Sequence, residues 1–151
     1  MGGYGGASGR FKGKCYYDTG NRKVIDKNAI EAAEYYIREG KYVAFLKQNP
    51  PDRRPDLSID RELLVEVKGM SSTIPHKAES NIKKAFEQIA SYWSHYPEDE
   101  RHPGKVVILS RHESFEEAYN AVREGFKVAK ARGYVHGPVE FWYHGKIFVM
   151  E

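Results

Sequence analysis

An alternation of apolar and polar residues with period two spans residues 56–68 and constrains the fold more than any other feature. Its apolar members are Leu57, Ile59, Leu63, Val65 and Val67. This pattern is typical of a β-hairpin. Residues that pair across an antiparallel hairpin share a face, so a common apolar face requires pairing of 57 with 65 and of 59 with 63. The turn is then the three residues 60–62, an acceptable hairpin connection.

The segments around this hairpin alternate between helical and strand patterns. Apolar spacing predicts helices over residues 28–39, 77–95 and 114–133, with Asn28 and Ser114 as N-caps. Short apolar runs predict strands over residues 42–46, 105–109, 139–143 and 146–150. This order indicates an α/β (mixed α+β) fold, in which a central mixed sheet is flanked by helices.

Length and composition favour one domain with a packed core. The chain has 151 residues, of which 40% are hydrophobic, and this argues against a disordered chain. The longest apolar runs are far shorter than the roughly 18 residues that a membrane span needs. Residues 1–22 show no apolar core of a signal peptide. Cys15 is the one cysteine, so no internal disulfide is expected.

Charge is distributed unevenly along the chain. Residues 1–23 contain five Lys or Arg and one Asp, together with seven of the 14 glycines. We therefore expect a flexible basic Gly-rich arm over 1–23, followed by a single near-neutral domain over 24–151. Such arms often contact nucleic acid, although a simple linker would have the same composition.

Three charged residues of the hairpin are predicted to lie on one face. Glu66 and Lys68 share a face of their strand because side chains alternate. The expected register also pairs Asp56 with Glu66, with their Cβ atoms about 5 Å apart. Two opposed carboxylates need a proton or a cation between them, and their oxygens suit Mg²⁺. The alternative is that Glu66 and Lys68 form the solvent-exposed face of a half-buried strand.

These residues resemble the metal site of the PD-(D/E)XK nuclease superfamily. Pro55-Asp56 and Glu66-Val67-Lys68 are similar to its Pro-Asp and Glu-x-Lys motifs. The resemblance implies a restriction-endonuclease-like core in which Asp56, Glu66 and the Val67 carbonyl bind Mg²⁺ or Mn²⁺. It also implies that Lys68 serves the attacking water. A second Pro-Asp at Asp52 competes with Asp56, but no apolar alternation follows it.

Residues 28–92 also resemble the C-terminal nuclease domains of contact-dependent growth inhibition toxins, several of which cleave tRNA. The resemblance implies that the helix at 28–39 contributes a metal-binding glutamate, for which Glu31 is the first candidate and Glu34 the substitute. The alternatives are a capping box formed by Asn28 and Glu31, and a surface ion pair between Glu34 and Arg38.

The next helix carries a Gln88 and Tyr92 pair that resembles the glutamine-tyrosine pair of some of these nucleases. The resemblance gives Gln88 a catalytic role. Six histidines are scattered along the chain without the close spacing of a zinc site. A metal-free ribonuclease that uses two histidines and a lysine remains an alternative.

The function expected from these features is metal-dependent endonucleolytic hydrolysis of phosphodiester bonds. The toxin resemblance implies a tRNA-cleaving RNase that acts in the cytoplasm, is delivered as part of a larger secreted toxin, and is neutralised by an immunity protein. A DNA endonuclease of restriction, repair or phage recombination type is an alternative. A further alternative is a nucleic-acid-binding module without activity.

Overall fold

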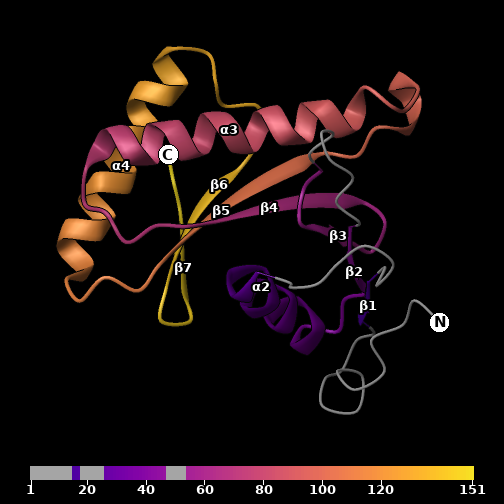
Figure 1. The fold of residues 1–151 in the computed structure, drawn as a ribbon, viewed down its shortest axis with the longest axis horizontal. Helices are drawn as coiled ribbons and strands as arrows, with labels where there is room; N and C mark the ends of the chain where they lie inside the picture. Colours follow the sequence, from indigo (N-terminus) through magenta and orange to yellow (C-terminus); the bar gives the residue numbers. More distant parts are fainter. Residues whose placement is uncertain (1–14, 18–25, 47–53) are drawn as a thin grey trace.

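The computed structural model describes residues 15–17, 26–46 and 54–151, which form a mixed sheet with helices on both faces (Figure 1). The sequence prediction of an α/β fold is therefore confirmed. The elements in chain order are β1 (Cys15–Tyr17), α2 (Lys27–Arg38), β2 (Val43–Phe45), β3 (Leu57–Ile59), β4 (Leu63–Gly69), α3 (Pro75–Trp93), the 3₁₀ turn η1 (Glu98–Glu100), β5 (Gly104–Ser110), α4 (Phe115–Ala131), β6 (Val139–Tyr143) and β7 (Lys146–Val149).

The seven strands lie in the sheet in the order of the sequence, from β1 to β7. The pairs β1/β2, β4/β5 and β5/β6 are parallel, and the remaining neighbours are antiparallel. Parallel neighbours need a crossover connection, and α2, α3 and α4 provide these three connections. Of the basic arm predicted over residues 1–23, the structure describes Cys15–Tyr17. These residues form the edge strand β1.

The β3/β4 hairpin has the register that its apolar pattern predicts. Leu57 pairs with Val65 and Ile59 pairs with Leu63, so the loop is residues 60–62. Asp60 adopts a φ of 53°, a left-handed conformation that Asp tolerates better than most residues. Its side chain also accepts a hydrogen bond of 2.8 Å from the backbone N–H of Tyr42. This contact ties the turn to the residue that precedes β2.

The two faces of the sheet carry separate cores. Alternate residues of β2 to β6 pack against α2 on one face, with Val65 and Val107 fully buried. The other alternate residues pack beneath α3 and α4, with Leu64 and Ile108 among them. Figure 1 shows α3 running along β4 on this second face. The face that carries Glu66 and Lys68 is therefore covered, and the alternative of a solvent-exposed strand face is wrong.

Helix ends follow local capping chemistry, with one correction. Ser114 caps α4 as predicted, because its hydroxyl accepts a hydrogen bond of 3.3 Å from the backbone N–H of Glu117. The prediction of Asn28 as the N-cap of α2 is wrong. The cap is Asp26, whose carboxylate accepts a hydrogen bond of 2.7 Å from the N–H of Asn28. Among the described helices, none is long and apolar enough to cross a membrane.

Candidate active site at the β3/β4 hairpin

Asp56 and Glu66 lie side by side, held by reciprocal hydrogen bonds between the start of β3 and the middle of β4. The backbone N–H of Asp56 donates to Oε1 of Glu66 at 3.1 Å. The backbone N–H of Val67 donates to Oδ2 of Asp56 at 3.0 Å. Each carboxyl group is thus fixed by an N–H of the neighbouring strand. The predicted proximity of these two residues is confirmed.

Lys68 and Gln88 complete this cluster from β4 and α3. Nζ of Lys68 lies 3.0 Å from Oε2 of Glu66 and donates a hydrogen bond of 2.6 Å to Oε1 of Gln88. The Glu66 side chain is 3% exposed, whereas that of Lys68 is 21% exposed. The structure therefore brings four of the five predicted site residues together, and Glu66 is the most deeply buried of them.

The cluster strongly favours protonation of its carboxyl groups. The pKa of Glu66 is raised to about 9, mainly by burial and also by the negative charge of Asp56, while the nearby Lys68 opposes the shift. Burial also raises the pKa of Asp56, against hydrogen bonds from Glu66 and Val67 that lower it. The charge of Asp26, at the start of α2, adds to the rise at Asp56. A cation bound here would therefore displace protons.

The oxygen atoms of this cluster suit a hard divalent cation. The carboxyl groups of Asp56 and Glu66 lie together, and the backbone of Val67 lies beside them, because its N–H donates to Asp56. Mg²⁺ is usually bound by one or two carboxylates, with waters or substrate phosphate completing its shell. Within residues 26–46 and 54–151, no group of three or more His, Cys, Asp or Glu is arranged to hold a metal. Asp56 and Glu66 are the two carboxyl groups that the β3/β4 hairpin brings together here.

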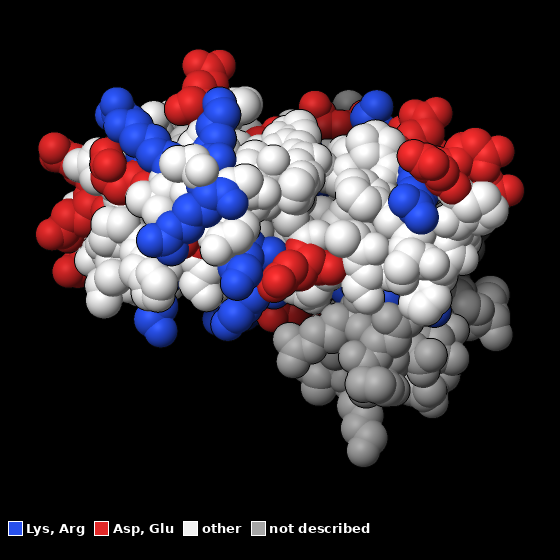
Figure 2. Space-filling model, turned by 90° about the horizontal axis from the view of Figure 1, so that it is seen from above, with Lys and Arg blue, Asp and Glu red and all other residues white. Residues whose placement is uncertain are grey.

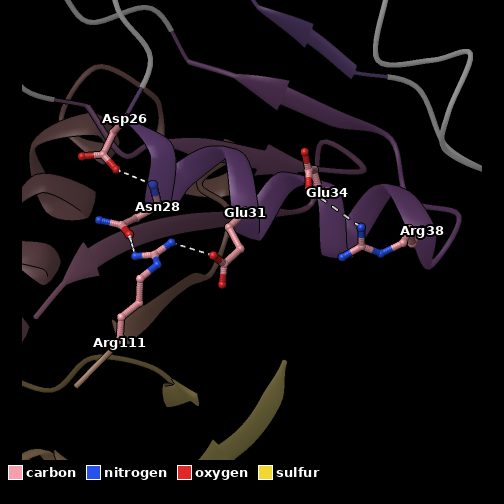
Figure 3. Close-up of polar contacts among 6 residues, drawn as sticks. All are labelled: Asp26, Asn28, Glu31, Glu34, Arg38 and Arg111. Carbon is pink, nitrogen blue, oxygen red and sulfur yellow. Dashed lines mark hydrogen bonds and ion pairs between the residues drawn. The ribbon is translucent and has the colours of Figure 1, made fainter. Parts of the chain in front are cut away.

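The structure does not bring Glu31 into this cluster. Figure 3 shows Glu31 and Asn28 turned toward Arg111, which follows β5. Arg111 donates to Oε1 of Glu31 at 2.6 Å and to Oδ1 of Asn28 at 2.5 Å. The capping box expected between Asn28 and Glu31 is replaced by this shared contact with arginine. Glu34 points away to Arg38 at 3.8 Å, which is the expected surface ion pair.

The first turn of α2 nevertheless lies close to the end of β4. A Cβ atom on Gly69 would lie 2.2 Å from Nδ2 of Asn28, so a side chain at this position would displace the Asn28 side chain. A hollow of about 310 Å³ opens beside this contact, and Lys27, Ser71 and Arg111 are among the residues that line it. This polar, basic hollow lies toward α2 at the carboxyl end of β4, whereas the Lys68 side chain lies on the face toward α3.

Sequence reasoning missed Asp26 and Arg111. An aspartate just before a helical pattern is itself a capping signal, which would have placed Asp26 at the helix start. Arg111 lies at the carboxyl end of a buried strand and has no local signal that pairs it with α2. Asp26 caps the first turn of α2, and Arg111 binds Asn28 and Glu31 of that helix.

Tyr92 lies one turn beyond Gln88 on α3, and its hydroxyl contacts that of Tyr96 at 3.3 Å. The pKa of Tyr92 is raised to about 12, mainly by burial and also by the contact with Tyr96, while the positive charge of Arg54 opposes the rise. The hydroxyl of Tyr92 is thus hydrogen-bonded to another tyrosine of the same region, Tyr96. The competing Asp52 lies outside the described residues.

The histidines with described contacts have partners away from the cluster. His76 lies 3.4 Å from Glu79, and the His112 ring accepts a hydrogen bond from the backbone of Ser114. Within the described residues, the polar contacts of these two histidines involve neither Lys68 nor another histidine. Comparisons with protein-family models, curated proteins and solved structures found no significant match.

Proposed function

We propose that this protein is a metal-dependent endonuclease that hydrolyses phosphodiester bonds at the β3/β4 hairpin. One observation carries the proposal, namely that Asp56 and Glu66 lie together with Nζ of Lys68 3.0 Å from Glu66. The two carboxyl groups can bind a divalent cation, and the amine beside them can donate a hydrogen bond to a water molecule. The same residues underlie the resemblance to the PD-(D/E)XK superfamily.

Each residue of the cluster has a role in this proposal. Asp56, Glu66 and the Val67 carbonyl hold Mg²⁺ or Mn²⁺, which supplies positive charge to the phosphate and lowers the pKa of a bound water. Lys68 orients the attacking water and stabilises negative charge that develops on the phosphate. Gln88 accepts a hydrogen bond from Lys68 and keeps its Nζ directed into the site. Gln88 is thus a positioning residue.

Energetic cost supports function over a purely structural role. Burying a carboxyl group costs desolvation free energy that a partner such as Lys68 need not offset in full. Here Glu66 is almost fully buried next to a second carboxyl group, and both have raised pKa values. An apolar residue at position 66 would pack against Leu64 and Val106 without this cost. Such perturbed groups are enriched at functional sites.

The substrate proposed from the toxin resemblance is tRNA. In that proposal the protein acts in the cytoplasm after delivery within a larger secreted toxin, and an immunity protein binds it. Lys27 and Arg111 at the hollow beside Gly69 offer positive charge to a phosphate backbone. This charge suits DNA equally, so a DNA endonuclease is the alternative that substrate tests must separate.

Incubation with different nucleic acids tests the proposal. The purified chain is incubated with tRNA, single-stranded DNA and duplex DNA, in Mg²⁺ and then with a chelator. We expect cleavage of tRNA that needs the metal and is lost in Lys68→Ala. Lys146→Ala is the control, because Lys146 is exposed at the start of β7, which lies at the far edge of the sheet from β3.

The other outcomes each overturn part of the proposal. Metal-dependent cleavage of DNA but not tRNA would establish the alternative substrate. Cleavage that survives the chelator would favour a histidine mechanism. Binding without cleavage of any substrate would identify a non-catalytic nucleic-acid-binding module.

A further inference from the structure

A second hollow, of about 250 Å³, lies on the other flank of α3, between this helix and the segment that leads into β6. The residues lining it are Lys83, Phe86, Glu87, Ala90, Tyr134 and His136. Phe86 is 3% exposed and forms the floor, whereas Lys83 and Glu87 are exposed at the rim. The hollow is smaller than the roughly 300–1,000 Å³ of sites for drug-sized ligands. It suits one flat ring.

The wall of this hollow is fixed by the backbone. Gly133 ends α4 with a φ of 78°, and the N–H of Tyr134 donates to the carbonyl of Ala129 at 2.9 Å. Gly137 lies so close to β5 that an added Cβ would be 2.3 Å from the carbonyl oxygen of Gly104. The segment is thus held at both ends, and the rings of Tyr134 and His136 are presented by a rigid stretch of chain.

The chemistry of the hollow matches an unpaired nucleobase. Nζ of Lys83 lies 5.1 Å from the centre of the Tyr134 ring, and the His136 ring meets Phe86 edge-on with ring centres 6.0 Å apart. An aromatic ring offers a stacking surface for a base, and a neighbouring cation binds its phosphate. The carboxylate of Glu87 can accept hydrogen bonds from an exocyclic amino group.

Helix α3 connects this hollow to the β3/β4 hairpin. Glu87 and Gln88 are consecutive, so they project about 100° apart around the helix axis. Gln88 contacts Lys68, whereas Glu87 lines the hollow. The two sites are thus separated by about the width of one helix, roughly 10–12 Å. A strand lying across α3 would reach both.

Basic side chains are frequent on the surface of α3 and α4. Figure 2, which looks onto α3, shows Lys and Arg side chains mostly over the left half of this face, with acidic groups at both ends and near the centre. The exposed basic residues of α3 and α4 are Lys77, Lys83, Lys84, Arg123, Lys127 and Lys130. A phosphate backbone crossing α3 would therefore meet cations on its path.

We propose that the hollow between α3 and Tyr134 binds an unpaired nucleobase of the strand that is cleaved at the β3/β4 hairpin. This inference rests on the proposed endonuclease function and adds to it a preference for single-stranded or looped substrate. The base stacks on Tyr134 while Lys83 binds the adjacent phosphate. Duplex substrate cannot use the hollow unless a base leaves its stack.

Binding measurements in a Lys68→Ala background test this site without cleavage. The probes are a fluorescent single-stranded RNA of about ten nucleotides, the same sequence as DNA, a blunt duplex and a free mononucleotide, followed by fluorescence anisotropy. Loss of one stacking contact corresponds to about a five-fold or greater weakening, which we expect for Tyr134→Ala. Tyr134→Phe keeps the ring and should bind like the parent. Circular dichroism verifies that each variant is folded.

Lys83→Ala should weaken binding and reduce its salt dependence. The matched control is Lys146→Ala, because Lys146 is an exposed lysine at the start of β7 and does not line the hollow. Equal affinity of Tyr134→Ala and its parent for both single strands would overturn the base site. Mononucleotide binding that depends on Tyr134, without binding of either strand, would identify a free-nucleotide site and overturn it as well.

The failures of the two proposals differ. If the active chain cleaves nucleic acid but Tyr134 has no effect on binding, the endonuclease stands and the base site is wrong. If single strands bind through Tyr134 but no substrate is ever cleaved, the base site stands on a binding module and the endonuclease is wrong.

Discussion

The backbone N–H of Asp56 donates a hydrogen bond of 3.1 Å to Oε1 of Glu66, which ties the start of β3 to the middle of β4. The N–H of Val67 returns the contact to Oδ2 of Asp56 at 3.0 Å. The two carboxyl groups are therefore held in place by main-chain groups rather than by each other alone. The position of each side chain therefore depends on a hydrogen bond that an uncharged oxygen could also accept.

Glu66→Gln should remove the charge and keep the geometry. An amide oxygen can still accept the hydrogen bond from Asp56, so we expect a folded protein. Cleavage should fall by about 100-fold or more, because the substitution removes one of the two carboxylates that hold the metal. Thermal unfolding and a cleavage assay measure the two effects. Glu62→Gln, in the exposed hairpin turn, is the control. A fully active Glu66→Gln would exclude Glu66 as a metal ligand.

Stability of the metal-free protein should fall as the pH rises from about 4.5 to about 9. The pKa of Glu66 is raised from 4.5 to about 9 by burial and by Asp56. In this range the unfolded chain loses the proton from Glu66 while the folded chain keeps it, so the free energy of unfolding decreases with pH. Denaturant unfolding at several pH values measures this slope.

Two comparisons isolate the contribution of Glu66 to that slope. Glu66→Gln should flatten the pH dependence, because glutamine does not titrate. Added Mg²⁺ should stabilise the protein more at pH 9 than at pH 6, since the cation competes with bound protons. A slope that is identical in the Glu66→Gln variant would show that other groups cause it.

Gln88→Ala should reduce cleavage by about 10-fold, less than the loss in Lys68→Ala. The amide of Gln88 accepts a 2.6 Å hydrogen bond from Nζ of Lys68, and residues that orient a metal-site group typically contribute 10- to 100-fold. Because the substitution frees the lysine without removing it, the pH–rate profile should also move. Asn120→Ala removes an exposed amide from α4 and is the control. An unchanged rate and profile would remove Gln88 from the site.

Glu31→Ala should leave metal affinity unchanged. Its carboxylate is held by Arg111 at 2.6 Å, and both side chains are more than 40% exposed, so the substitution should cost less than about 1 kcal/mol of stability. Calorimetric titration with Mn²⁺ compares it with Glu34→Ala, which breaks the exposed pair with Arg38. Weaker Mn²⁺ binding in Glu31→Ala alone would make Glu31 a ligand, as the toxin resemblance implies.

The hairpin was predictable because its information is local. Alternating apolar residues allow one register that keeps them together, and that register places Asp56 beside Glu66 without any knowledge of the rest of the fold. The same reasoning wrongly left open a solvent-exposed face for Glu66. Its burial depends on the course of α3 across β4, which no local pattern in residues 56–68 encodes.

Glu31 illustrates the opposite limit. Its helix was predicted within one residue at each end, yet the side chain could not be assigned to a partner. That partner is Arg111, 80 residues away, and it becomes a neighbour because β5 lies beside β4 in parallel. Gln88 also depends on tertiary packing, and its place in the cluster was expected from the resemblance rather than from helical spacing.

The short connection between β3 and β4 has a consequence for the order in which the protein assembles. Asp56 and Glu66 are ten residues apart, so closing the chain between them costs little entropy, and the carboxyl pair can meet as soon as the hairpin forms. Lys68 acquires its Gln88 partner only when α3 docks. A folding chain would accordingly bring the two carboxyl groups together early and fix Lys68 late, so the four-residue cluster is complete only when α3 covers the sheet.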